Sequence, residues 1–180
     1  MEQRKIYHAR LMHARSFIDS LDFARNGQQI SGEVPVAELP RLMGVLENPQ
    51  GTLRYSVQGV VDKQGNPALH ISVAGQCQLR CQRCLNDLAY PVRLDTRLLL
   101  RDQASLDTLD DNVVGTEQEE FDSILADVHL NVLNLLEEEI LLSLPIAPKH
   151  ELGACQVTDG ENAHREEKNP FAVLAKLKRS

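Results

Sequence analysis

The chain has 180 residues, of which 42% are hydrophobic, and a formal net charge of −7 at pH 7. Its first residues form no apolar signal-peptide core, and no later apolar run reaches the roughly 18 residues that a membrane span requires. We therefore expect a cytoplasmic protein without membrane contact. The excess of acid also disfavours a protein that coats nucleic acid tightly and non-specifically.

The predicted elements begin with a poorly patterned N-terminal part, residues 1–50. Within it, only residues 39–46 read as a short helix, with Pro40 tolerated in the first turn. Three later segments alternate apolar and polar side chains with the period of two that is typical of half-buried strands. These segments are residues 52–62, 69–79 and 88–100. Because short connections join them, we expect an antiparallel β-meander.

An acidic stretch follows the meander. Between Asp102 and Glu139 the chain carries twelve acidic residues and no lysine or arginine, so the rest of the chain is basic on balance. Residues 102–120 contain few apolar side chains and no clear period, which predicts a mobile surface loop. Residues 121–130 either extend the next helix or form a separate strand, and we favour the strand. The acidic stretch suits a basic partner, although a solvated surface explains it equally well.

A long helix is predicted over residues 131–144. Asn131 is a suitable N-cap, and the apolar positions after it recur every three or four residues, with Leu142 among those expected on the buried face. Pro145 ends the helix, and Glu137 to Glu139 are expected on its wet edge. The fold class is thus α+β, an antiparallel β-meander packed with a long helix. We predict a single α+β domain over residues 1–156, with residues 1–50 as its least defined part.

The C-terminal end has two predicted parts, a flexible linker over residues 157–168 and a helical docking segment over residues 169–180. The linker is polar and strongly charged. The segment's apolar positions are Phe171, Leu174 and Leu177, with Lys176 and Lys178 near its C-terminal end. An isolated helix this short is marginal in water, so it needs its own domain or a partner for order. The charged linker favours a partner.

The cysteines and one histidine form a candidate metal site. Cys81-x-x-Cys84 lies between two predicted strands, and His150 and Cys155 follow the long helix, which together make a tetrahedral Cys3His set suited to one structural zinc ion. The identity of Leu85 disfavours a zinc site, because many metal knuckles have glycine at this position to allow a positive φ. Two other readings stay open, thiols without metal and, less favoured, a redox pair. Cys77 has the strand parity of a core residue.

A set of arginines is the candidate RNA-phosphate contact. They share the face of the meander opposite its apolar side, and they are Arg54, Arg93, Arg97 and Arg101. Such a face can bind phosphates, but ordinary solubilising charge explains it at least as well. With no Trp and only seven Phe and Tyr residues, base stacking on the sheet is disfavoured.

Three sequence runs carry a family resemblance. They are Cys81-Gln82-Arg83-Cys84-Leu85, Leu144-Pro145-Ile146-Ala147-Pro148 and the run from Asn169 to Lys178. With them the chain closely resembles the YceD family, the bacterial large ribosomal RNA subunit accumulation proteins. The resemblance spans roughly residues 50–180, and it implies that the position of His150 is sometimes cysteine, an exchange that zinc ligation tolerates.

The resemblance implies a non-enzymatic role in the synthesis, processing or stability of 23S ribosomal RNA, and so in large-subunit assembly. The alternative is a protein-binding adaptor that recruits an assembly factor or a ribosomal protein without touching RNA. The sequence contains no Ser-His-Asp order, phosphate-cradling glycine loop or His-Glu-x-x-His helix, so we expect neither an enzyme nor a small-molecule substrate. The expected partner is ribosomal RNA or a pre-ribosomal protein.

Overall fold

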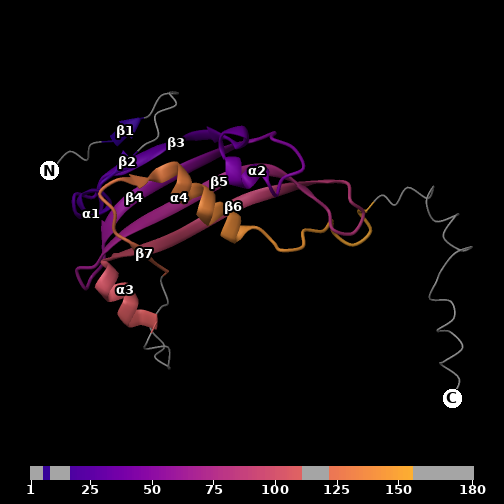
Figure 1. The fold of residues 1–180 in the computed structure, drawn as a ribbon. Helices are drawn as coiled ribbons and strands as arrows, with labels where there is room; N and C mark the ends of the chain where they lie inside the picture. Colours follow the sequence, from indigo (N-terminus) through magenta and orange to yellow (C-terminus); the bar gives the residue numbers. More distant parts are fainter. Residues whose placement is uncertain (1–5, 9–16, 111–121, 156–180) are drawn as a thin grey trace, which may run out of the picture.

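The structure is a computed structural model that describes residues 6–8, 17–110 and 122–155. Its main feature is one mixed sheet with the strand order β1-β3-β4-β5-β6-β7 (Figure 1). The strand bounds are β1 Ile6–His8, β3 Gln29–Pro35, β4 Thr52–Val61, β5 Pro67–Arg80, β6 Asp87–Arg101 and β7 Ser123–Leu125. Strands β3 to β6 form an antiparallel meander. Strands β4 to β6 confirm the three predicted strands, and β3 is a fourth that was not predicted, whereas β1 and β7 pair in parallel at the two edges.

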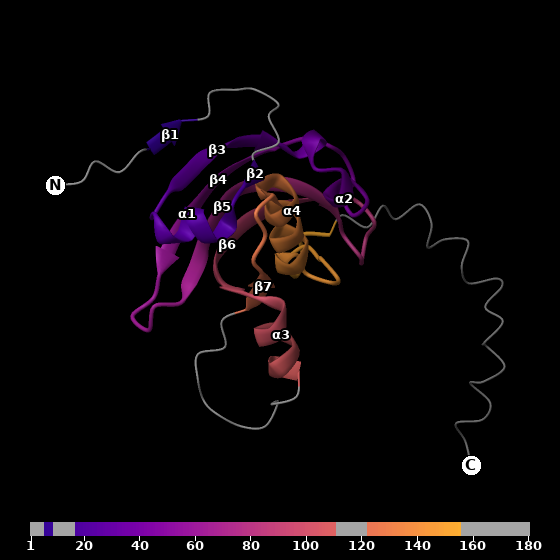
Figure 2. The same ribbon diagram turned by 60° about the vertical axis from the view of Figure 1, so that its left-hand side comes forward.

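Short helices and a second small sheet complete the described fold. They are the two-stranded pair β2 Phe17–Ile18 with β8 Leu130–Asn131, the 3-10 helix η1 Val36–Glu38, and the helices α1 Ser20–Arg25, α2 Pro40–Met43, α3 Gln103–Asp110 and α4 Val132–Ser143. Figure 2 shows the sheet arching over α4, with α1 towards one end and α2 towards the other. The fold is therefore α+β. No helix among the described residues is long and apolar enough to cross a bilayer.

Helix α4 covers the inner face of the sheet, as the sequence predicts. The side chain of Asn131 accepts hydrogen bonds from the backbone N–H groups of Leu133 and Asn134, which makes it the N-cap. Val132, Leu136 and Ile140 are fully buried against the sheet. Leu142, which the spacing placed on the buried face, is 77% exposed.

The acidic residues of α4 correct one expectation. Glu137 and Glu139 were predicted on the wet edge of the helix, but they are 2% and 8% exposed. Glu137 Oε1 accepts hydrogen bonds from the backbone N–H groups of Arg41, at 2.5 Å, and Leu42, at 2.9 Å. These N–H groups belong to the first turn of α2, where no residue of the same helix can accept them. A buried carboxylate of α4 therefore ties α2 to the core.

The stretch after β6 departs partly from the predicted loop. Residues 103–110 form α3, whose first turn is closed by a hydrogen bond from Ser105 N to Asp102 Oδ1 at 2.8 Å. The separate strand predicted within residues 121–130 is confirmed by β7, which adds to the sheet beside β6. The predicted linker, residues 157–168, and the docking segment, residues 169–180, lie outside the described residues.

Candidate metal centre

The turn between β5 and β6 positions the first pair of thiols. These strands pair as far as Arg80 opposite Asp87, and the turn is closed by Cys81 N donating to Asn86 O at 3.0 Å and Leu85 N donating to Cys81 O at 2.9 Å. Leu85 has a φ of 61°. It adopts the left-handed conformation that a metal knuckle needs, so the absence of glycine at this position does not prevent the knuckle from forming.

The second pair lies on the segment that follows α4. This segment is held against the turn by Gln82 N, which donates to Pro148 O at 2.8 Å. Arg83 Nη2 donates to the carbonyl oxygens of His150 and Glu151 at 3.3 Å and 3.1 Å. One backbone hydrogen bond and two from the Arg83 side chain thus hold two distant parts of the chain together.

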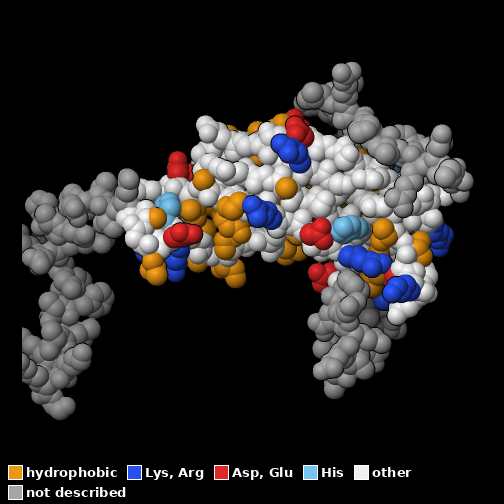
Figure 3. Space-filling model, turned by 180° about the vertical axis from the view of Figure 1, so that it is seen from behind, with side chains coloured by type: hydrophobic (Ala, Val, Ile, Leu, Met, Phe, Trp, Pro, Cys, Tyr) orange, Lys and Arg blue, Asp and Glu red, His pale blue; other side chains and the backbone are white. Residues whose placement is uncertain are grey.

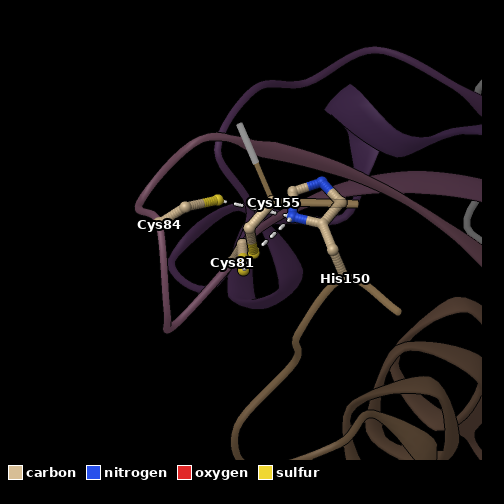
Figure 4. Close-up of side chains that lie close together, drawn as sticks. All are labelled: Cys81, Cys84, His150 and Cys155. Carbon is tan, nitrogen blue, oxygen red and sulfur yellow. Dashed lines mark hydrogen bonds between the residues drawn. The ribbon is translucent and has the colours of Figure 1, made fainter. Parts of the chain in front are cut away.

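The structure brings all four predicted ligands into one cluster, formed by Cys81, Cys84, His150 and Cys155 (Figure 4). Their ligand atoms lie within 4.8 Å of one another. Cys81 Sγ and Cys155 Sγ are 3.8 Å apart, and His150 Nδ1 lies 3.4 Å from Cys84 Sγ and 3.6 Å from Cys155 Sγ. A tetrahedron with Zn–S bonds of about 2.3 Å and Zn–N bonds of about 2.0–2.1 Å has S···S edges of about 3.8 Å and S···N edges of about 3.5 Å. These three separations therefore fit a zinc-sized ion.

The orientation of His150 also suits a metal ligand. Its Nε2 lies 3.0 Å from the backbone carbonyl oxygen of Asp87, which can only accept a hydrogen bond. Nε2 therefore carries the proton in the neutral ring, and the lone pair of Nδ1 points towards the thiols. The contact with Cys155, followed by the one with Cys81, raises the pKa of His150. In a cluster without metal, the imidazole ring of His150 can thus share a proton with the thiols.

Neighbouring groups help two of the three thiols to ionise. Burial opposes ionisation of Cys81, but backbone hydrogen bonds, the largest at Cys84, lower the pKa of its thiol to about 5. Burial also opposes ionisation of Cys155, whose pKa is nevertheless lowered because Arg83 Nε donates to its Sγ at 2.9 Å. A backbone hydrogen bond from Asn86 favours ionisation of Cys84. Burial and the neighbouring sulfurs outweigh it and raise the pKa of this thiol. Thiolates are the form that binds metal.

Arg83 is the residue of this site that sequence reasoning missed. Three thiolates and one divalent ion leave a net charge of −1, which the guanidinium of Arg83 offsets at the site itself. The signal was present in the sequence, because an arginine between the two cysteines of a Cys-x-x-Cys turn is held next to any anionic cluster there. Cys77 is fully buried in the core and is not part of the cluster. This agrees with its position in the predicted strand, where it shares the apolar face.

The candidate RNA contact lies on the outer face of the sheet, which α4 leaves uncovered. Arg54 and Arg93 stand in one row across the strands, with Ala74 between them. Together they line a hollow of about 440 Å³. Arg97 lies further along β6 in a second hollow of about 580 Å³. Arg101 lies at the border with β7.

Acidic side chains are interleaved with these arginines. Arg54 Nε donates to Glu33 Oε1 at 3.0 Å, and Asp95 Oδ1 lies 3.1 Å from Nε2 of His70. Figure 3, which views the molecule from behind, shows Lys and Arg side chains scattered among acidic and uncharged ones. The four arginines therefore share a face but do not form an unbroken basic stripe. The candidate docking residues Phe171, Leu174, Leu177, Lys176 and Lys178 lie outside the described residues.

Comparison with known proteins identifies a family and a relative that match most of the chain. The family model described as "Large ribosomal RNA subunit accumulation protein YceD" matches residues 69–178. A protein of Haemophilus influenzae that bears the same description is 26% identical over 168 residues, which cover 89% of this chain and 94% of that protein. No solved structure matches the chain. The family match includes all four residues of the Cys3His cluster.

Proposed function

The chain belongs to the YceD family of large ribosomal RNA subunit accumulation proteins, and on that premise we propose that it is a non-enzymatic factor in the synthesis, processing or stability of 23S ribosomal RNA. The family match carries this proposal. A supporting observation is that the cluster supplies four protein ligands, which is typical of closed structural sites and leaves no open position for a substrate.

The Cys3His cluster is proposed to hold one structural zinc ion. The separations of its ligand atoms, the hydrogen bond that orients His150 and the nearby charge of Arg83 all support this assignment. The ion would join the β5–β6 turn to the segment after α4, and its contribution is to the stability of this end of the fold. A cluster of thiols without metal is the competing reading, and zinc analysis separates the two.

Direct contact with RNA is proposed for the outer face of the sheet. Arg54 and Arg93 border a hollow whose floor includes the small residues Ser56, Ser72 and Ala74, so a phosphate group could approach both guanidinium groups. Arg97 and Arg101 would extend the contact towards β7. The interleaved acids favour contacts at a few positions over broad electrostatic binding.

The second candidate is a protein adaptor that affects ribosomal RNA through a protein partner. It is favoured by the exposed apolar side chains at the metal-centre end of the molecule, among them Leu85, Leu142, Ile146 and Leu152. Exposed apolar groups gathered at one place are typical of protein contacts. The partner would be an assembly factor or a ribosomal protein.

Two measurements test the proposal. Depletion of the protein in cells should lower 23S relative to 16S ribosomal RNA, and an unchanged ratio would refute the family role for this chain. Crosslinking in cells followed by pulldown, with and without RNase, then separates the two candidates. Protein contacts that survive RNase support the adaptor, whereas crosslinks to 23S RNA that decrease in an Arg54→Gln/Arg93→Gln variant support direct binding. Arg41→Gln, on α2, is the matched control for loss of a positive charge.

A further inference from the structure

An apolar groove lies at the end of α4, and we call it the terminal groove. It has a volume of about 400 Å³. Its lining is mostly apolar, with Val45, Leu79, Leu141, Leu144, Ile146 and Pro148 among its residues, and it also includes the polar side chains of Arg80 and Gln82. Ile146 is fully exposed at 104% and Val45 is 52% exposed. Figure 3 shows hydrophobic side chains gathered along the lower edge of its left-hand half. Single exposed apolar residues are ordinary, but several that line one concavity indicate a binding surface.

Hydrogen bonds hold the walls of the terminal groove in place. Glu47 N donates to Gln78 O at 2.9 Å, which holds the chain after α2 against β5. On the other side, Gln82 N fixes Pro148 through its carbonyl oxygen, at 2.8 Å. The walls thus come from three separate parts of the chain, the α2–β4 connection, β5, and α4 with the segment after it. The groove is therefore formed before any occupant binds, which lowers the entropy cost of binding.

The chain itself carries a matching apolar segment, which follows the described residues in the sequence. The described chain ends at Cys155, in the metal cluster, and the cluster's turn is bonded to the groove residue Pro148. Thirteen residues, 156–168, separate Cys155 from the segment at 169–180. An extended chain of that length spans up to about 45 Å, so every part of the groove is within reach. We propose that the terminal groove is the seat of the chain's own residues 169–180.

The apolar character of the groove fits this occupant. Phe171, Leu174 and Leu177 would share one side of a short helix, and an apolar groove accepts that kind of side. Charge adds no attraction, because the acids beside the groove already face arginines. Glu47 Oε2 lies 3.8 Å from Arg80 Nε, and Glu138 Oε2 lies 3.9 Å from Arg41 Nη1. The occupant is therefore assigned by apolar contact and by the reach of the linker.

Tethering makes even a weak contact effective. A short linker gives an effective concentration on the order of 1 mM. A contact with a Kd of about 100 µM then seats the segment in roughly nine-tenths of the molecules. A protease that cuts only the released segment would be slowed by about tenfold. This inference goes beyond the role in ribosomal RNA and does not depend on it.

Limited chymotrypsin digestion of the full chain tests the proposal. Residues 156–168 contain no Phe, Tyr, Trp, Leu or Met, so the first cuts in this part of the chain are expected after Phe171, Leu174 and Leu177. Their initial rates, followed by mass spectrometry, should be about tenfold lower than in a synthetic peptide of residues 156–180. Equal rates in the full chain and the peptide would overturn the proposal.

Surface variants locate the seat. Ile146→Asp alters a fully exposed groove residue and should raise the cutting rate towards that of the peptide. Val61→Asp is the matched control, since Val61 is 47% exposed at the far end of β4 and should have no effect. If Ile146→Asp also has no effect, the segment is not in the groove. Rates that change on tenfold dilution of the protein would show that the segment binds a second copy, which also overturns the proposal.

Discussion

Glu137 offers the sharpest test of how this fold is held together. Its carboxylate is 2% exposed and accepts two backbone hydrogen bonds from the first turn of α2, at Arg41 N and Leu42 N. Replacing it with alanine removes both bonds and leaves buried N–H donors without an acceptor. Hydrogen bonds to charged groups contribute about 1.5–3 kcal/mol each. Relief from burying a carboxylate offsets part of that loss.

We therefore expect Glu137→Ala to lower the free energy of unfolding by about 2–4 kcal/mol, a large part of the roughly 5–15 kcal/mol typical of a domain. Glu137→Gln keeps an acceptor oxygen and should cost about 1 kcal/mol. Glu138→Ala is the matched control on the same helix. Its carboxylate is 3.9 Å from Arg41 Nη1 with both side chains 55% exposed, so it should cost less than about 0.5 kcal/mol.

Urea unfolding followed by circular dichroism at pH 7 measures all three variants under the same metal conditions. With a slope of about 2 kcal/mol per molar urea, Glu137→Ala should shift the midpoint by about 1–2 M. A shift no larger than that of Glu138→Ala would show that α2 is held by apolar packing alone and would refute the reasoning from hydrogen bonds.

Three further predictions concern the metal centre, pH and RNA. Protein purified without chelator should contain about one zinc ion per chain. The Cys84→Ser variant should lose the bound zinc, and the Cys77→Ser variant should retain it. Equal zinc contents in the two variants would refute the ligand assignment. Burial, with smaller contributions from nearby carboxylates, raises the pKa of Glu139, so its charged form opposes folding at neutral pH. Glu139→Gln should thus raise the midpoint of thermal unfolding at pH 7. The gain should vanish below about pH 4, where the wild-type carboxyl is protonated in both the folded and the unfolded state. A larger gain at the lower pH would contradict this explanation. For an RNA ligand, Arg93→Gln should reduce the salt slope of binding by about one unit, whereas Arg41→Gln should leave it unchanged, as titrations at several salt concentrations would show.

The parts of the fold that could be predicted are those governed by local periodicity. The alternation along β4, β5 and β6 reports which face each side chain occupies, and Asn131 lies next to the N–H groups that it caps. The cysteine and histidine set was found because its residue types have few other uses in such a pattern. For the strands and the helix cap, the residues that determine the structure lie within a few positions of one another.

The missed features either depend on groups far away in the sequence or are too short or too irregular to leave a local pattern. Glu137 reads as part of a solvated acidic run, and only the arrival of α2, almost a hundred residues earlier in the chain, turns it into a buried cap. The positive φ of Leu85, by contrast, depends on the hydrogen bonds that close its own turn, within five residues. The edge strand β1 is three residues long, too short for an alternating pattern to be recognised.

The Cys3His cluster has a consequence for the order in which the chain folds. It joins residues that are 66 to 74 positions apart, whereas short turns join β4 to β5 and β5 to β6. Closing a long loop costs more chain entropy than closing a hairpin, so the meander should form first and the cluster last. A metal ion bound at that late stage would stabilise contacts that form after the folding transition state. It should lengthen the lifetime of the folded protein by slowing unfolding, and leave the rate of refolding almost unchanged.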